Sequence, residues 1–231
     1  MSDKRSLPVK PPLLRDEALR AQLLARLSTF EVHRHAGAGG HRAAVALAIV
    51  DEGPGADLGG LPHYTSPSNR AAMLLTRRSA ALRNHAGQWA LPGGRIDGDE
   101  TPEQAALREL AEEVGLELDG GSVLGRLDDF ATRSGFVITP VVVWAGTGEH
   151  LVPKPEEVQS VHRIPVQEFL RADAPMLDDL PGSAHPVLRM PVGHSWIAAP
   201  TAAFLYQFRE LCLLGRPTRV AHFEQPHFAW R

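Results

Sequence analysis

Three glutamates carry the clearest chemical signal in this chain. Glu109, Glu112 and Glu113 stand close together in one acidic stretch. At about 100° per residue, their side chains would fall within about 100° of one another on a helix. Like charges at this spacing repel, so such a cluster is either solvated or used to hold cations. We expect the three carboxylates to converge with no basic residue among them. Mg²⁺ suits such a site, because it takes oxygen ligands from carboxylates and substrate phosphates.

The residues around the glutamates predict a helix that would position them. Thr101 suits the N-cap, Pro102 suits the first helical position, and Gln104 completes a capping box. Gly115 is typical of the residue that ends a helix. An apolar stripe repeats at helical spacing, roughly opposite the glutamates: Leu107, Leu110, Ala111 and Val114. An amphipathic helix with a solvated acidic face is the alternative to a cation site.

The same stretch resembles the Nudix box, with every fixed position filled. The pattern is Gly94, five residues, Glu100, seven residues, then Arg108-Glu109-Leu110-x-Glu112-Glu113-x-Gly115-Leu116. The resemblance implies a loop–helix–loop that binds Mg²⁺ or Mn²⁺ and activates water against a diphosphate. It also implies a role for each acidic position: Glu109, Glu112 and Glu113 as metal ligands, and Glu100 orienting the loop or binding a further metal through water. Arg108 would lie near Glu100 and shape the turn.

The segment before the box, from Leu74 to Gly94, resembles the motif that precedes it in coenzyme A diphosphatases. Only Leu91, in place of a phenylalanine, departs from that motif, and Trp89 is larger than expected. The arginines Arg78 and Arg83 suit phosphate oxygens, with Arg83 the stronger candidate for the 3′-phosphate of coenzyme A. Glycines let a backbone approach a ligand closely, and three stand here: Gly87, Gly93 and Gly94. The alternative is that the arginines are surface charges and the glycines only form turns.

The two resemblances together imply a hydrolase of a nucleoside diphosphate derivative. The expected substrate is coenzyme A or acyl-coenzyme A, cleaved to 3′,5′-ADP and 4′-phosphopantetheine or its acyl form. ADP-ribose or NADH is the alternative substrate, and a non-catalytic nucleotide-sensing domain is the alternative of another class. Glu112 is the preferred general base, and the downstream Glu156 or Glu157 is the other option.

Composition sets outer limits on what the chain does. The 231 residues carry 24 basic and 27 acidic side chains, a net charge of −3, which offers no general attraction for nucleic acid. The sequence holds no apolar run of 18 residues and no signal-peptide pattern, so we expect a cytoplasmic protein without a membrane segment. The lone Cys212 lies in an apolar run and is expected to be a buried structural thiol. The assembly is left open between a monomer and a homodimer.

Strands mixed with a few helices predict an α+β fold. The Nudix resemblance implies an α/β/α sandwich with a mixed β-sheet. We expect an N-terminal tail and helix over 1–39, the Nudix domain over 40–215, and a C-terminal tail over 216–231. Helices are predicted at 13–30, 166–171 and 201–214. Extended segments are predicted at 42–51, 71–78, 123–130, 135–144, 158–164 and 188–192. An exposed loop is predicted at 52–69 and irregular chain at 173–186.

Overall fold

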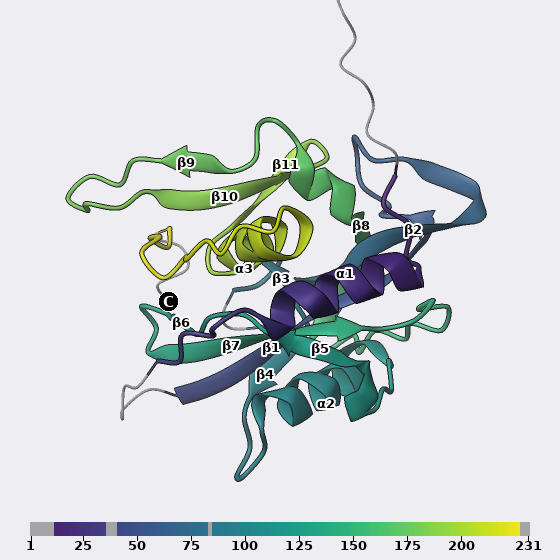
Figure 1. The fold of residues 1–231 in the computed structure, drawn as a ribbon, viewed down its shortest axis with the longest axis horizontal. Helices are drawn as coiled ribbons and strands as arrows, with labels where there is room; N and C mark the ends of the chain where they lie inside the picture. The colour runs from purple at the N-terminus through teal and green to yellow at the C-terminus, as the bar shows by residue number, and fades with distance from the viewer. Residues whose placement is uncertain (1–11, 36–40, 83–84, 227–231) are drawn as a thin grey trace, which may run out of the picture.

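The computed structural model describes residues 12–35, 41–82 and 85–226. A curled β-sheet forms the middle layer of the fold (Figure 1). One helix, α2 (Pro102–Val114), covers one face, and two helices, α1 (Glu17–Ser28) and α3 (Thr201–Phe208), cover the other. This arrangement confirms the predicted α/β/α sandwich.

The central sheet combines parallel and antiparallel pairs, as expected. Its main path runs β3 (Trp89–Ala90), β2 (His63–Arg78), β1 (His41–Gly55), β7 (Phe136–Trp144) and β5 (Val123–Arg126). Three further strands pair beside this path: β4 (Gly93–Arg95) with β1, β6 (Phe130–Ala131) with β7, and β8 (Val158–Pro165) with β2. The pair β1–β7 is parallel, and the other pairs of this sheet are antiparallel.

Alternation along β1 explains why both faces of the sheet are covered. Successive side chains of a strand point to opposite faces. Leu47 and Ile49 join the core beneath α1 and α3, whereas Ala46 and Ala48 join the core beneath α2. Leu23 of α1 is fully buried in the first of these cores, so the N-terminal helix belongs to the same packed body.

The predicted loop at 52–69 is wrong. Strand β1 continues to Gly55 and β2 begins at His63, so most of the segment forms a long antiparallel hairpin. Glycines and prolines usually indicate a loop, but here the glycines sit at irregularities in the pairing. Gly53 and Gly55 have φ of 59° and 110°. Bulges of this kind bend a strand without ending it.

A second sheet was only partly predicted. It contains β9 (Met176–Asp178), β10 (Val187–Val192) and β11 (Ser195–Ala198), and lies against the outer side of α3 (Figure 1). The extended segment near β10 is confirmed, but β9 lies inside the stretch expected to be irregular. A 3₁₀ helix covers Val166–Leu170 and another Gly120–Ser122. A π-helical segment, Arg209–Leu213, continues α3 close to the predicted end of that helix.

Two further observations bear on the limits set by composition. Cys212 is fully buried, and burial raises the pKa of its thiol to about 12, which confirms the expected structural thiol. In the described part of the chain, no helix has the length and apolar character that crossing a membrane requires.

Candidate active site

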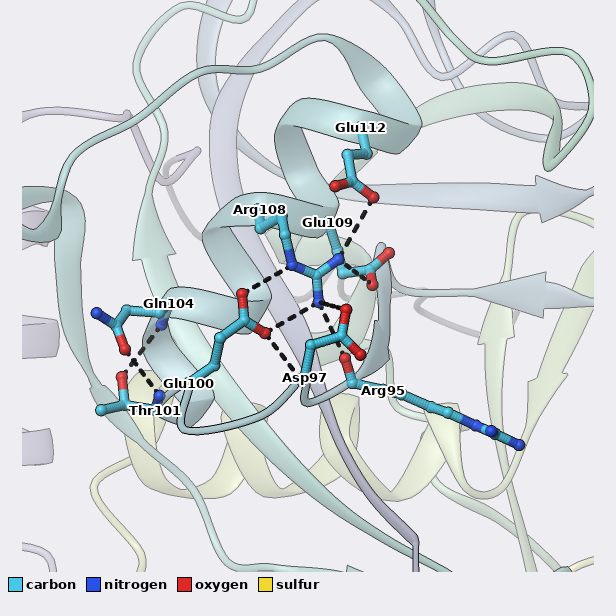
Figure 2. Close-up of polar contacts among 8 residues, drawn as sticks. All are labelled: Arg95, Asp97, Glu100, Thr101, Gln104, Arg108, Glu109 and Glu112. Atoms are coloured by element: carbon cyan, nitrogen blue, oxygen red, sulfur yellow. Dashed lines mark hydrogen bonds and ion pairs between the residues drawn. The ribbon is translucent and has the colours of Figure 1, made fainter.

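Helix α2 is positioned by the local signals that the sequence contains. Thr101 accepts a hydrogen bond from the Gln104 backbone amide at 3.3 Å, and the Gln104 side chain accepts from the Thr101 amide at 2.8 Å (Figure 2). Both halves of the predicted capping box are therefore present. The helix ends at Gly115, whose φ of 70° suits a residue without a Cβ.

The acidic face of α2 is not simply solvated. The side chain of Glu112 is 51% exposed, whereas Glu109 and Glu113 are 8% and 5% exposed as residues. Glu109 lies against Gly94 of strand β4, where a Cβ would clash with its carboxylate. The alternative of a solvated acidic face therefore fails for two of the three glutamates.

Arg108 organises the loop that leads into the helix. Its Nε and Nη2 donate to Oε1 and Oε2 of Glu100 at 2.8 and 3.1 Å (Figure 2). Nη2 also donates to the carbonyl of Arg95 at 3.0 Å. The Asp97 amide donates to the same Glu100 carboxylate at 3.0 Å. Glu100 thus ties the residues before the helix to Arg108 and has no carboxylate oxygen outside this network.

The expectation that no basic residue stands among the three glutamates is wrong. Nη1 of Arg108 donates to Oε1 of Glu109 at 2.8 Å and to Oε2 of Glu112 at 3.3 Å (Figure 2). Across residues 12–35, 41–82 and 85–226, no three acidic, histidine or cysteine side chains are arranged to hold a metal ion as they stand. The arginine draws two of the carboxylates toward itself, so the predicted convergence is not present.

Glu113 lies on the buried side of this cluster, and no arginine or lysine in the described part of the chain forms an ion pair with its carboxylate. Burial, and then the charge of Glu109, raise the pKa of Glu113 to about 8, while Arg78 and the Gly93 amide oppose the shift. Burial also raises the pKa of Glu109, against the opposing effect of Arg108. Two buried carboxylates with raised pKa values mark a place short of positive charge.

These residues fit a divalent cation by their chemistry. Arg108 occupies only Oε1 of Glu109, and Glu113 lacks an ion pair with any described residue. Carboxylate oxygens are the ligands that Mg²⁺ and Mn²⁺ prefer. The absence of a side chain at Gly94 keeps the Glu109 carboxylate in place beside strand β4.

The residues of the upstream segment lie at the end of β2, in the turn that follows it and at the start of β4. Arg78 ends β2 and acts on Glu113 electrostatically. Gly87 has a φ of 67° and donates its amide to the Arg78 carbonyl at 3.0 Å, so it shapes the turn between β2 and β3. Gly93 packs on β1, where a Cβ would clash with the backbone of Val45. Arg83 lies outside the described residues.

A cavity of about 270 Å³ opens beside these residues. Its wall includes Arg78 and Gly93 from the upstream segment, and Phe136 from β7. Sequence reasoning missed its far wall, which Thr201 and Phe204 of α3 provide. No sequence signal marked these two positions, because they read as ordinary members of an apolar helix.

The two other candidates for the general base, Glu156 and Glu157, lie in the downstream acidic turn and differ in their effect on the acidic cluster. Glu157 acts on both Glu109 and Glu113 electrostatically, whereas no such effect on them arises from Glu156. The turn is attached to α2, because the Lys154 amide donates to the Glu113 carbonyl at 2.9 Å. The Lys154 side chain pairs with Glu157 at 2.7 Å. Glu157 is therefore the member of this pair that lies near the acidic cluster.

The comparisons with known proteins agree with this fold and this loop–helix. The NUDIX domain model matches residues 64–181, and the chain belongs to the Nudix family. A relative from Citrobacter koseri, "Uncharacterized Nudix hydrolase NudL", is 44% identical over 103 residues, covering 44% of this chain and 54% of the relative. "Nudix hydrolase 3" of Caenorhabditis elegans is 39% identical over 106 residues, covering 44% of each chain. The chain spans about half the length of the curated relatives it matches.

Solved structures of the family also resemble this chain. A MutT/nudix family protein from Enterococcus faecalis has a TM-score of 0.44 and 16% identity, covering 77% of this chain and 57% of that one. The Nudix hydrolase RenU from M. smegmatis has a TM-score of 0.38 and 28% identity, covering 60% of this chain and 81% of that one.

Proposed function

We propose that this protein is a divalent-metal-dependent hydrolase that cleaves the diphosphate bond of coenzyme A or acyl-coenzyme A. The products would be 3′,5′-ADP and 4′-phosphopantetheine or its acyl form. One observation carries the proposal: Arg78 and the Gly93 amide both act on Glu113, and both residues line the neighbouring cavity. A diphosphate at this mouth would meet the acidic cluster on one side and an arginine on the other.

Glu109, Glu112 and Glu113 would hold Mg²⁺ or Mn²⁺ in this proposal. The bound ion would neutralise diphosphate oxygens and lower the pKa of a water molecule. Glu112 is half-exposed and held by Arg108 at 3.3 Å, the longest of the hydrogen bonds that this arginine makes, so it can turn toward a cation at small cost. Glu100 is better suited to orienting the loop than to binding a metal, because Arg108 and the Asp97 amide engage its carboxylate.

A carboxylate of this chain would accept the proton of the attacking water. Glu112 remains the first candidate, since its carboxylate is exposed at the acidic face. Glu157 is the alternative that the geometry favours over Glu156, because its charge acts on Glu109 and Glu113. Comparing Glu112→Gln with Glu157→Gln would identify the base: only its loss should remove the acidic limb of the pH–rate profile.

A substrate panel tests the proposal directly. Coenzyme A, acyl-coenzyme A, ADP-ribose, NADH and diadenosine polyphosphates would be incubated with the full chain and Mg²⁺ or Mn²⁺. Phosphatase-coupled phosphate release would report turnover. The expected result is the highest kcat/KM for coenzyme A or its acyl form, abolished by a chelator.

Two outcomes would contradict the proposal at different levels. Preference for ADP-ribose or NADH would exclude coenzyme A as the main substrate and leave the diphosphate hydrolase. Absence of turnover with every compound and both metals would favour a nucleotide-sensing domain instead.

A further inference from the structure

A second cavity lies on the other side of Trp89 from the first. It has a volume of about 310 Å³, and its wall includes Arg77 from β2 and Ser195 and Trp196 from β11. The two cavities adjoin, because both are lined by the same four residues: Gln88, Trp89, Pro200 and Thr201. A ligand in the first cavity could therefore extend into the second.

Arg77 brings an uncompensated positive charge to this second cavity. Its guanidinium lies 3.8 Å from the centre of the Trp89 ring, and its Nη1 donates to the Gly87 carbonyl at 3.1 Å. Among the described residues, no carboxylate lies within ion-pair distance of Arg77. Burial lowers the pKa of its guanidinium, as expected for a charge without a counter-ion. Partly buried charges are normally paired, so this guanidinium is suited to binding an anion that enters the cavity.

Trp89 forms the wall of the second cavity beside Arg77. The residue is 9% exposed, and its Nε1 is buried without a hydrogen-bond partner among the described residues. Because this nitrogen is itself shielded from the cavity, Trp89 contributes the face of its ring to the cavity wall and not a hydrogen bond to a ligand. The large side chain that departs from expectation at this position thus both stacks on Arg77 and separates the two cavities.

The neighbouring arginines line different cavities, Arg78 the first and Arg77 the second. Met73 and Leu75 face the core beneath α1 and α3, and Leu74 faces the core beneath α2. Arg77 continues the first set along β2, but the register of β2 against β8 shifts between Arg77 and Arg78, so strict alternation ends at Arg77. Arg78 acts on Glu113, whereas Arg77 stacks on Trp89 in the wall of the second cavity. The two charges therefore serve different places.

We propose that the second cavity is a subsite for a phosphate monoester, bound by the guanidinium of Arg77, which stacks on the ring of Trp89. The inference rests on the proposed function, in which the monoester is the 3′-phosphate of the coenzyme A nucleotide. Arg78 then serves the diphosphate near the acidic cluster. Arginine suits a phosphate because its planar donors match the oxygens of that group.

Equilibrium binding tests the subsite without turnover. Calorimetric titration would compare adenosine 3′,5′-bisphosphate with adenosine 5′-monophosphate, without metal. The full chain should bind the bisphosphate at least about 10-fold more tightly. Arg77→Gln should abolish that preference, and Arg77→Lys should retain part of it. Arg70→Gln is the matched control, because it removes the same charge from the same strand about 23 Å away.

A second pair of variants tests the subsite independently, in case Arg77→Gln does not fold. Ser195 is exposed at the start of β11 and lines the second cavity. Ser195→Asp places a negative charge there and should weaken bisphosphate binding, whereas the neutral Ser195→Asn should not. Retained preference for the bisphosphate in both Arg77→Gln and Ser195→Asp would overturn the inference.

Kinetics separate this inference from the proposed substrate. Arg77→Gln should raise KM for coenzyme A about 10-fold or more and leave dephospho-coenzyme A nearly unchanged. Equal losses on both substrates would indicate a structural role and overturn the subsite. If the wild-type chain hydrolyses ADP-ribose but neither coenzyme, the proposed substrate is wrong, while the bisphosphate titration still decides the subsite.

Discussion

Gly94 lies so close to Glu109 that a Cβ added to it would stand 2.6 Å from the carboxylate carbon of the glutamate. The glycine belongs to strand β4, and the glutamate belongs to helix α2. Strand β4 and helix α2 thus pack so closely at the acidic cluster that no space remains for a methyl group on Gly94. The position of Glu109 therefore depends on the absence of a side chain at Gly94.

This contact predicts that Gly94→Ala inactivates the protein without unfolding it. The clashing atoms are the end of a flexible side chain, so Glu109 should move while the strand stays. Misplacement of a catalytic group by about 1 Å can cost about 100-fold in rate, and we expect a loss approaching that size. Thermal unfolding and metal-dependent turnover would be measured together. Gly120→Ala is the control, because a Cβ there meets open space. Full activity of Gly94→Ala would show that Glu109 need not keep its position.

Replacement of the buried glutamate should separate function from stability. Glu113→Gln should lower turnover by about 100-fold or more, since a metal site contributes several kcal/mol to the transition state. Thermal stability without metal should hold or rise, because burial and the charge of Glu109 disfavour the ionised form of Glu113, and a neutral glutamine avoids that cost. Turnover near the wild-type rate under saturating Mg²⁺ would disprove the metal-site assignment.

The pair formed by Arg108 and Glu100 should be energetically coupled. Their side chains are 27% and 24% exposed, and two hydrogen bonds join them. A double-mutant cycle with Arg108→Gln and Glu100→Gln should give a coupling of about 1 kcal/mol in the free energy of unfolding. Arg20 and Glu17, a surface pair 3.9 Å apart, should give nearly none. Equal coupling in the two cycles would mean that Arg108 does not organise the loop.

His162 should make the stability of the fold depend on pH. Its Nδ1 donates to the Ala56 carbonyl at 2.8 Å, so Nε2 of the neutral ring accepts from Ser160 at 2.8 Å. Burial lowers the pKa of His162 below its usual value of 6.5. The unfolded chain therefore binds the proton first, and stability is lost as the pH falls from about 6.5 through the folded pKa.

Denaturant unfolding between pH 5 and 8 would measure this effect. The contribution of His162 can reach at most about 1.4 kcal/mol per pH unit. His162→Gln should flatten the decline, whereas replacement of the exposed His63 by Gln should leave it as in the wild type. An unchanged slope in His162→Gln would assign the pH dependence to other groups.

Local signals were sufficient for the loop–helix of the site. The cap at Thr101, the capping box with Gln104 and the end at Gly115 are decided by hydrogen bonds among residues at most a few positions apart. The contact of Arg108 with Glu100 also spans only eight residues. The sequence by itself therefore determined where α2 begins and ends and which side chains its acidic face carries. Apolar runs rich in β-forming residues similarly predicted the central strands β1 and β7.

Tertiary structure alone decided what surrounds those side chains. The burial of Glu109 comes from strand β4, and that of Glu113 from strand ends and a turn far away in the sequence. Arg77 lines a cavity only because β11 and the residues before α3 pack beside it. These segments lie more than 110 residues further along the chain. The physical reason is that caps and periodicity depend on near neighbours. Desolvation and the lack of a counter-ion depend on which distant segments pack together.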